Sequence, residues 1–325
     1  VEAIRTFPGV TRKHTIHEIV KYLPTNSFTN VAANEGEDAA AIEYGDNYLL
    51  FAADGIMESL LKTNPFYAGY FAVLVNINDI AAMGGKALAM VDVMSMKDEK
   101  VCSQILRGME YAVKKFNVPI VGGHTHPDCQ YHAIDISIIG TVPKADIILS
   151  STAECDDDII FAMDTCGFFP PDLKYAYDTT TNKEDKLVRN QIDAMCEIAS
   201  KKLVHAAKDI SNPGCIGTMG MLLESSGKGG YVNIDKIPVP SGDVDLIQWI
   251  LSYQGYGFVL SCSPENSQEV IDIFKSVECE GAVVGKVNDS QIFSLKTDTE
   301  EKILFDFNND IITGCNPTRK LQRQS

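Results

Sequence analysis

PFYAGYFAVLVNINDIAAMGG, residues 65–85, is the stretch of sequence that decides the fold. Its apolar run opens at a proline and closes at two glycines, which is the punctuation expected of a long helix. Asp79 is the single charged residue inside this stretch. A carboxylate that is buried among apolar side chains needs a compensating partner. We therefore expect polar or charged groups from other segments of the chain to lie beside Asp79.

Strand and helix patterns alternate on both sides of this helix, which predicts an α+β fold built of α/β layers. The other predicted elements of the first half are strands at 39–42, 48–53, 87–96, 118–121 and 132–142, and helices at 15–24 and 98–116. The strand at 118–121 is expected to end in a loop, Gly122-Gly123-His124-Thr125.

The second half repeats the alternation. Its predicted elements are strands at 158–164, 256–263 and 282–287, and helices at 189–209, 215–227, 241–253 and 267–277. A polar, proline-containing segment at 167–186 predicts a loose loop or a lid. Turn residues and charge near position 150 predict an N-terminal domain, 1–150, and a C-terminal domain, 151–325, which suits a chain of 325 residues.

The formal net charge of −16 argues against a nucleic-acid partner, because such a surface repels a polyanion. A nucleotide remains compatible, since Mg²⁺ bridges carboxylates to phosphates. The nine cysteines form no C-x-x-C pair, which favours a reducing compartment over a disulfide scaffold. The sequence has no apolar run of about 18 residues and no signal-peptide pattern, so we expect a cytoplasmic protein without a membrane partner.

The best-known phosphate-binding loops are absent from the sequence. Gly84-Gly85-Lys86 lacks the upstream glycine of the Walker pattern and is followed by Ala87 rather than serine or threonine. No predicted strand is followed by G-x-G-x-x-G. Any nucleotide must therefore be held by other groups.

A zinc site is one alternative, because His124-x-His126-x-Asp128 fits the pattern H-x-H-x-D. Imidazole and carboxylate ligands at that spacing suit Zn²⁺. Hydrolases that begin this way usually have a histidine directly after the aspartate, where this chain has Cys129. A zinc-dependent hydrolase therefore stays open as the less favoured alternative.

Four aspartates stand out because they lie at the ends of apolar runs or, for Asp79, inside one: Asp38, Asp54, Asp79 and Asp209. A lone aspartate at a strand end is often only a turn or cap residue. Several that converge would form a Mg²⁺ site for a nucleoside triphosphate. The sequence alone does not show that they converge.

Four segments together resemble the PurM-like superfamily, which includes aminoimidazole ribonucleotide (AIR) synthetase, selenophosphate synthetase, thiamine-monophosphate kinase and the hydrogenase-maturation carbamoyl dehydratase. They are GEDAAAI (36–42), NDIAAMGG (78–85), GGHT (122–125) and AAKDISNPG (206–214), in the family's order over almost the whole chain. The likeness is greatest to AIR-synthase-related proteins regarded as methanogenesis markers, through GTMGMLLE (217–224). Glu37 and Asn212 each replace a family aspartate, and residues 1–30 lack the cysteine of selenophosphate synthetases.

The resemblance implies a homodimer in which the N-terminal domains share a β-barrel, beside a C-terminal α/β sandwich. ATP then lies in a cleft formed at the dimer. The implied Mg²⁺ ligands are Asp38, Asp54, Asp79 and Asp209, and the implied catalytic residues are Asp54, Asp79 and His124. The implied nucleotide-binding residues are Lys13, Gly36, Asp38, Asn78, Gly122, Gly123, Thr125 and Asp209. Lys13, with its neighbour Arg12, is expected to fold over the triphosphate.

We therefore expect a Mg-ATP-dependent enzyme, kinase-like or synthetase-like, that phosphorylates or activates a small metabolite. An alternative from another class is a nucleotide-binding cofactor-maturation factor with little turnover. The second substrate is not specified by any motif, and we expect it near the segment 166–186 and the surface between the domains.

Overall fold

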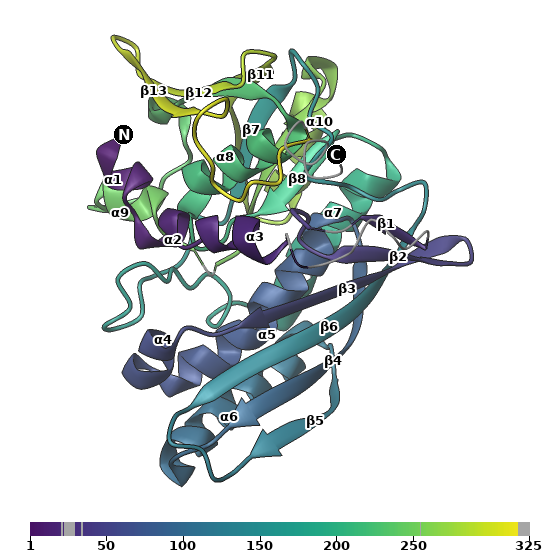
Figure 1. The fold of residues 1–325 in the computed structure, drawn as a ribbon, viewed down its shortest axis with the longest axis vertical. Coiled ribbons are helices and arrows are strands. Elements are labelled where there is room, and N and C mark those ends of the chain that lie inside the picture. The colour runs from purple at the N-terminus through teal and green to yellow at the C-terminus, as the bar shows by residue number, and fades with distance from the viewer. Residues whose placement is uncertain (21, 23–29, 34, 254, 318–325) are drawn as a thin grey trace.

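The computed structural model describes residues 1–317 except positions 21, 23–29, 34 and 254. Two sheets with their helices make up the molecule, the N-terminal sheet below and the C-terminal sheet above in Figure 1. The predicted mixture of α/β layers is confirmed. The expected end of the first helix at Pro24 lies outside the described residues, and the part before it contains α3 (His14–Ile19).

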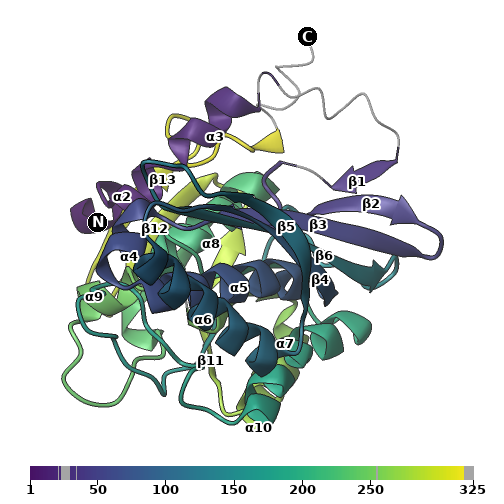
Figure 2. The ribbon, with the colours of Figure 1, turned by 90° about the horizontal axis from the view of Figure 1, so that it is seen from below.

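The first sheet has six strands in the order β1-β2-β3-β6-β4-β5. They are β1 (Val31–Ala33), β2 (Ala40–Tyr44), β3 (Asn47–Gly55), β4 (Lys86–Ser95), β5 (Ile120–His126) and β6 (Ala133–Pro143). Neighbouring strands are antiparallel except β4 and β5, which are parallel. Helices α5 (Pro65–Ala82) and α6 (Glu99–Phe116) lie along one face of this sheet (Figure 2).

Helix α5 is the predicted central helix, and its surroundings explain its sequence. It begins where the Asn64 side chain accepts a hydrogen bond from the amide of Tyr67 at 3.3 Å, with a proline at its first position. Gly69 on α5 and Gly108 on α6 lie where the helices approach so closely that a Cβ would overlap the opposite backbone. Because α6 and the sheet enclose α5, its apolar side chains are buried almost all round, and Asp79 is held on a fixed support.

The second sheet has seven strands in the order β13-β12-β9-β11-β7-β10-β8. They are β7 (Asp158–Met163), β8 (Ala206–Asp209), β9 (Gly229–Asn233), β10 (Gly257–Cys262), β11 (Glu280–Asn288), β12 (Ile292–Lys296) and β13 (Glu301–Asp306). Alternate residues of β7 enter two cores: Phe161 packs with α8 (Gly214–Ser226), and Ile160 packs with α7 (Asp185–Ser200) and α10 (Ser267–Ser276). Helices therefore cover both faces, and β8 lies at an edge.

The N-terminal helices pack on the second sheet's core rather than on the first. The short helices of the chain are α1 (Glu2–Arg5), α2 (Pro8–Thr11), α3, α4 (Glu58–Thr63) and α9 (Leu246–Ile250). The Arg5 guanidinium donates to both carboxylate oxygens of Asp310 at 2.9 Å, and Ile4 and Val10 belong to the second core.

The domain boundary expected at residue 150 stays a prediction. No helix in the described part of the chain is both long enough and apolar enough to cross a bilayer.

The segment Gly122–Thr125 was predicted as a loop, and that prediction was wrong. It continues strand β5, which pairs with β4 in parallel. A Cβ on Gly123 would overlap Asp92 of β4, so this glycine permits the pairing. The strand therefore runs through a glycine pair that sequence signals assign to a turn.

The helix predicted at 189–209 was wrong at its C-terminal end. Helix α7 stops at Ser200, and Lys202 beyond it adopts a left-handed φ of 56°. Strand β8 follows and pairs with β10. The helix predicted at 241–253 is likewise reduced to α9, which begins at a cap formed by the Asp245 side chain.

The predicted strand pair around Gly45-Asp46-Asn47 is confirmed as β2 and β3. The segment 167–186 has no strand and no helix before α7, as predicted, but it is not loose. The buried carboxylate of Asp178 accepts hydrogen bonds from the amides of Thr180 and Thr181 at 2.9 and 3.0 Å, and from the Tyr67 hydroxyl of α5 at 3.2 Å. These bonds anchor the segment to the first core.

Candidate functional site

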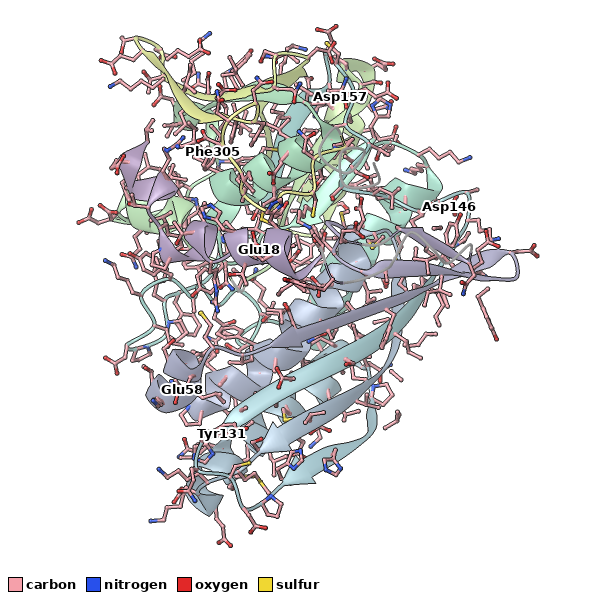
Figure 3. The ribbon with its side chains drawn as sticks, in the orientation of Figure 1. Glu18, Glu58, Tyr131, Asp146, Asp157 and Phe305 are labelled. Atoms are coloured by element: carbon pink, nitrogen blue, oxygen red, sulfur yellow. The ribbon has the colours of Figure 1, made fainter. Side chains whose placement is uncertain are left out.

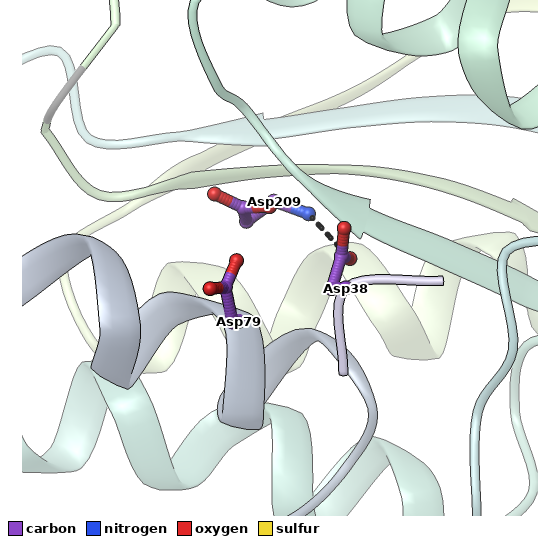
Figure 4. A group of neighbouring side chains, drawn as sticks. All are labelled: Asp38, Asp79 and Asp209. Atoms are coloured by element: carbon purple, nitrogen blue, oxygen red, sulfur yellow. Dashed lines mark hydrogen bonds between the residues drawn. The ribbon is translucent and has the colours of Figure 1, made fainter. Parts of the chain in front are cut away.

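Three of the predicted aspartates meet at one point of the structure. Asp38 precedes β2, Asp79 is on α5, and Asp209 ends β8. One carboxylate oxygen from each lies within 4.8 Å of those of the other two (Figure 4). Segments of the first sheet, its central helix and the second sheet thus build one acidic cluster, which we call the aspartate trio.

Backbone contacts hold Asp38 over the end of α5. The amide of Ala39 donates to Met83 Sδ at 3.1 Å, just beyond the helix. Gly36 has a φ of +101°, and a Cβ there would press against Cys315, so the turn requires glycine. The Ser150 hydroxyl donates to the Gly36 carbonyl at 3.1 Å. Gly36 therefore fixes the position of the Asp38 carboxylate through its backbone.

A cavity brings Asp209 of the trio together with other predicted residues. Its lining includes Lys13, Asp54, Asn78, Asp209, Asn212 and Tyr253. Asn78 is only 2% exposed, and its amide nitrogen donates to the Gly255 carbonyl at 3.2 Å. The Asn78 Oδ1 atom has no hydrogen-bond partner in the described structure. A buried acceptor without a donor, beside carboxylates, is an atom that a bound cation would satisfy.

Lys208 forms an ion pair with Asp38 inside this site. The two side chains are 4% and 5% exposed. The Lys208 ammonium also donates to the Gly36 carbonyl at 3.4 Å, and the Asp209 amide donates to Asp38 Oδ2 at 3.4 Å. Both oxygens of the Asp38 carboxylate therefore face donors from β8.

Burial and crowding raise the pKa values of the trio. Burial is the largest cause at Asp79, and the negative charges of Asp54, Asp209 and Asp38 raise its pKa further. The pKa of Asp209 is also well above its ordinary value, through burial and the charge of Asp38. Burial raises the pKa of Asp38, although the charge of Lys208 opposes this shift. Carboxylates this close are not all ionised unless a cation joins them.

Asp54 and Lys208 complete the set of charged groups around the trio. Burial raises the pKa of the Asp54 carboxyl and the charge of Lys13 lowers it. The charge of Asp38 adds to the effect of burial, so the net pKa of Asp54 is raised, as in the trio. Burial lowers the pKa of Lys208, but the charges of Asp38 and Asp209 outweigh it and the net pKa is raised. Lys208 is therefore a permanent cation at neutral pH.

The donor set fits a hard divalent cation. The trio and Asn78 Oδ1 offer oxygen ligands, which Mg²⁺ prefers, and a divalent ion would relieve the repulsion among the carboxylates. Asp54 adds a carboxylate on the side of the cavity. Within the described residues, no histidine or cysteine joins this cluster, so its chemistry favours Mg²⁺ over Zn²⁺.

The predicted phosphate-binding residues of β5 lie elsewhere. Residues Gly122–Thr125 are exposed, and the described lining of the cavity includes none of them. Strand β5 is three strand spacings from β3, or roughly 14 Å. Tyr131, in the turn after β5, lies at the opposite end of the molecule from Asp157 (Figure 3). Because the described lining of the cavity beside Asp54 contains no residue of β5, His124 is not part of that cavity in one chain.

The alternative zinc site is not assembled in this chain. Over the described residues, the aspartate trio is the only set of three or more His, Cys, Asp or Glu side chains whose ligand atoms converge. The rings of His124 and His126 stack edge to face with centroids 4.6 Å apart, and Asp128 does not complete a ligand set with them. His132 Nδ1 instead accepts a hydrogen bond from the Lys97 amide at 3.3 Å.

Sequence reasoning missed one residue of the site and left the role of a second open. Lys208 stands in AAKD, a lysine in an apolar strand, and the burial argument applied to Asp79 would have found it. Glu37, which replaces a family aspartate, accepts hydrogen bonds from the Ser150 amide and, at 2.6 Å, from the Ser151 hydroxyl. The Glu37 carboxylate therefore ties the segment before β2 to the chain near residue 150.

Comparison with known proteins identifies the family of the chain. Residues 36–142 match AIR synthase related protein, N-terminal domain, and residues 173–298 match AIR synthase related protein, C-terminal domain. The chain is 45% identical to an uncharacterised protein of Methanocaldococcus jannaschii over 319 residues, 97% of this chain and 98% of that protein. It is 25% identical to the phosphoribosylformylglycinamidine cyclo-ligase of Methanococcus maripaludis over 307 residues, 85% of this chain and 87% of that protein.

A solved structure shares the fold. PurL of Thermotoga maritima, complexed with ATP, matches with a TM-score of 0.73 at 17% identity, over 91% of this chain and 49% of that chain. The chain thus spans about half the length of PurL, and a likeness at this identity shows the fold alone. Asp38 and Asp79 lie in the first family match and Asp209 in the second, so the trio joins the two matched regions. The chain belongs to the AIR synthase related family and has its PurM-like, mixed α/β fold.

Proposed function

We propose that this protein is a Mg-ATP-dependent enzyme, kinase-like or synthetase-like, that phosphorylates or activates a small metabolite. The observation that carries the proposal is the aspartate trio, whose ligand atoms lie within 4.8 Å of one another at the meeting of the two family regions. The ATP complex of PurL supports the choice of nucleotide, and the cyclo-ligase relative supports the reaction class.

In this proposal Asp38, Asp54, Asp79 and Asp209 hold Mg²⁺, together with the amide oxygen of Asn78. The ion supplies neutralisation of the triphosphate charge. The chain's own contribution is positioning, because α5 and β8 are packed elements that hold the carboxylates in fixed places. Lys13 lines the same cavity, which supports a role for its ammonium in pairing with a phosphate oxygen.

We also propose that the working form is a homodimer in which a second copy covers the open face of the first sheet, as in a shared barrel. Five large apolar residues of β3, β4 and β5 are 44–66% exposed on this face: Phe51, Leu88, Val91, Val93 and Val121. A contiguous apolar patch of this kind marks an interface, and β5 is an edge strand with an unpaired side. Pairing there would bring Gly122, Gly123, His124 and Thr125 against the second copy, and so toward a nucleotide bound at the dimer.

Calorimetric titration of ATP into metal-free protein, with and without Mg²⁺, tests the proposed function, with ADP measured afterwards. Asp79→Asn removes one charge of the trio at constant size. Asp272→Asn, on the exposed side of α10, is the matched control. We expect Mg-dependent binding and slow ADP formation by the wild type and the control, and loss of both in Asp79→Asn. Absence of ATP binding by the wild type in either condition would overturn the proposal.

A nucleotide-binding factor with little turnover is the second candidate, and the ion pair of Lys208 with Asp38 favours it. An ammonium on Asp38 leaves less negative charge for a catalytic metal ion. Mg-dependent ATP binding without ADP formation above the buffer rate, over a panel of small phosphate, amide and carboxylate acceptors, would favour this candidate over the enzyme.

A further inference from the structure

We propose that Lys208 is a built-in cation of the aspartate site, which takes the place of one divalent ion and so limits the number of metal ions that accompany the nucleotide. This inference rests on the proposed function, because it concerns the same site. It adds a residue that is not among the implied ligands, and it concerns stoichiometry rather than the identity of the metal.

The contacts of Lys208 place its charge at the trio. It precedes Asp209 on β8, and its ammonium pairs with Asp38 and lies 3.4 Å from the Gly36 carbonyl. The Lys208 side chain is only 4% exposed, so bulk water does not screen its charge. The ammonium is therefore a fixed positive charge on one of the three carboxylates that would otherwise bind metal.

Lys208 and a metal ion would compete for the same carboxylate. The Lys208 ammonium binds Asp38 Oδ1, while Oδ2 of the same residue faces the Asp209 amide at 3.4 Å. An additional divalent ion on Asp38 would lie close to the ammonium, and the two positive charges would repel in a site with little water. Asp79 and Asp209 lack such a paired cation among the described residues, so they remain the stronger metal ligands.

Lys208 could instead serve only to tie the two sheets together through its ion pair with Asp38, but this role explains the lysine less well than a role as a cation of the site. Glu37 already ties the same segment to the Ser150 amide and the Ser151 hydroxyl, and the Ser150 hydroxyl donates to Gly36. A buried ion pair is also a weak stabiliser compared with apolar side chains of similar volume. The presence of a buried charge in the strand AAKD is better explained by the carboxylates that it faces.

Counting Mn²⁺ ions tests the proposal without any measurement of activity. Free Mn²⁺ is followed by electron paramagnetic resonance during titration of the full chain, with the non-hydrolysable nucleotide AMPPCP present and absent. The variants are Lys208→Met, which removes the charge, and Lys208→Arg, which keeps it. We expect Lys208→Met to bind one more Mn²⁺ per chain than the wild type, or the same number about tenfold more tightly, and Lys208→Arg to match the wild type.

A second pair of variants guards against a folding defect in Lys208→Met. Asp38→Asn leaves the Lys208 ammonium uncompensated, so Mn²⁺ affinity should fall at least tenfold. The double variant Asp38→Asn, Lys208→Met should bind Mn²⁺ at least threefold more tightly than Asp38→Asn alone. No such recovery of affinity is expected if Lys208 only ties the two sheets together. Circular dichroism checks that each variant is folded.

The outcomes separate this inference from the proposed function. Equal Mn²⁺ stoichiometry and affinity in the wild type and Lys208→Met, or a double variant no tighter than Asp38→Asn, would overturn the role of Lys208 alone. A wild-type chain that binds no Mn²⁺ with or without AMPPCP would overturn the proposed metal site and this inference together.

Discussion

The aspartate trio and strand β5 carry two parts of one family resemblance, yet they stand in opposite environments. The trio comes from three separate segments, and burial and mutual repulsion raise its pKa values. The residues Gly122–Thr125 of β5 are consecutive, exposed and at the edge of a sheet. A resemblance identifies residues that act together, but the fold of one chain decides which of them are already together.

Under the proposed dimer, this difference divides the site into a part that is complete in one chain and a part that a second copy would complete. The trio is tied to Gly36, Lys208 and the end of α5 by contacts within the chain. The described lining of its cavity contains no residue of β5. We therefore expect changes in the trio to act on metal and nucleotide directly, and changes near β5 to act through association.

The largest effect is expected from Asp79→Ala. It removes a ligand of the proposed metal site and leaves its neighbours without the charge that attracts the ion, so Mg-dependent ATP affinity should fall by about 100-fold or more. Calorimetry in Mg²⁺ measures the change. His124→Ala on β5 is the comparison, and under dilute conditions that favour single chains it should change the affinity by less than threefold, which is about 0.6 kcal/mol. Equal losses in both variants would break the division between the two regions.

The second effect concerns the open sheet face. Val93→Arg places a charge on an exposed apolar surface of β4 and should convert a dimer to single chains of 35.6 kDa, measured by light scattering. Loss of the second copy should weaken ATP binding roughly tenfold, or about 1.4 kcal/mol. Ile303→Arg, on exposed β13 of the second sheet, is the matched control and should change neither quantity. A Val93→Arg protein that stays dimeric would place the interface elsewhere.

The third effect is a dependence of thermal stability on pH. The pKa values of Asp79 and Asp209 are raised in the folded protein, so these carboxyls stabilise it fully at pH values below about 4, their ordinary range, and lose that contribution as pH rises through the raised values. The Tm of metal-free protein should therefore fall from pH 5 to pH 8, by roughly 2 °C for each loss of about 1.4 kcal/mol of stability in a chain of 325 residues.

Magnesium should reverse this trend, because the ion stabilises the ionised carboxylates. The increase in Tm on adding Mg²⁺ should be larger at pH 8 than at pH 5, measured by differential scanning fluorimetry in both buffers. Asp79→Asn should flatten the pH dependence of the metal-free protein. If the Tm of the wild type and that of Asp79→Asn depend on pH in the same way, the pKa of Asp79 is not raised in the folded protein.

How much of this was predictable from the sequence differs between the two regions. The helix of residues 65–85 and the strands around Asn47 were predicted, because apolar periodicity and turn residues are local signals. The convergence of Asp38, Asp79 and Asp209 depended on the family resemblance, since no local pattern connects β2, α5 and β8. Lys208 was missed, although its apolar neighbours carried a signal of burial.

The predicted loop at 122–125 and the predicted helix end at 209 were wrong for the same reason, which is pairing between strands far apart in the sequence. Strand β5 continues through two glycines because β4 lies beside it, and residues 206–209 are a strand because β10 pairs with them. Both segments have local sequences that favour another structure, and tertiary contacts override the preference. The exposed residues of β5 were therefore placed in a loop that the chain does not form.

The smallest effect distinguishes the two glycines within β5 itself. A Cβ on Gly123 would overlap Asp92, whereas the Cβ position of Gly122 has open space around it. Gly123→Ala should therefore lower the free energy of unfolding by about 1–3 kcal/mol, and Gly122→Ala should change it by less than about 0.5 kcal/mol, in urea titrations. If Gly122→Ala nevertheless weakens ATP binding in the dimer, close approach of phosphate to this strand is supported, because its stability would be intact. An unchanged ATP affinity in Gly122→Ala would argue against contact between phosphate and this part of β5, and would favour a nucleotide site made by the trio and its cavity alone.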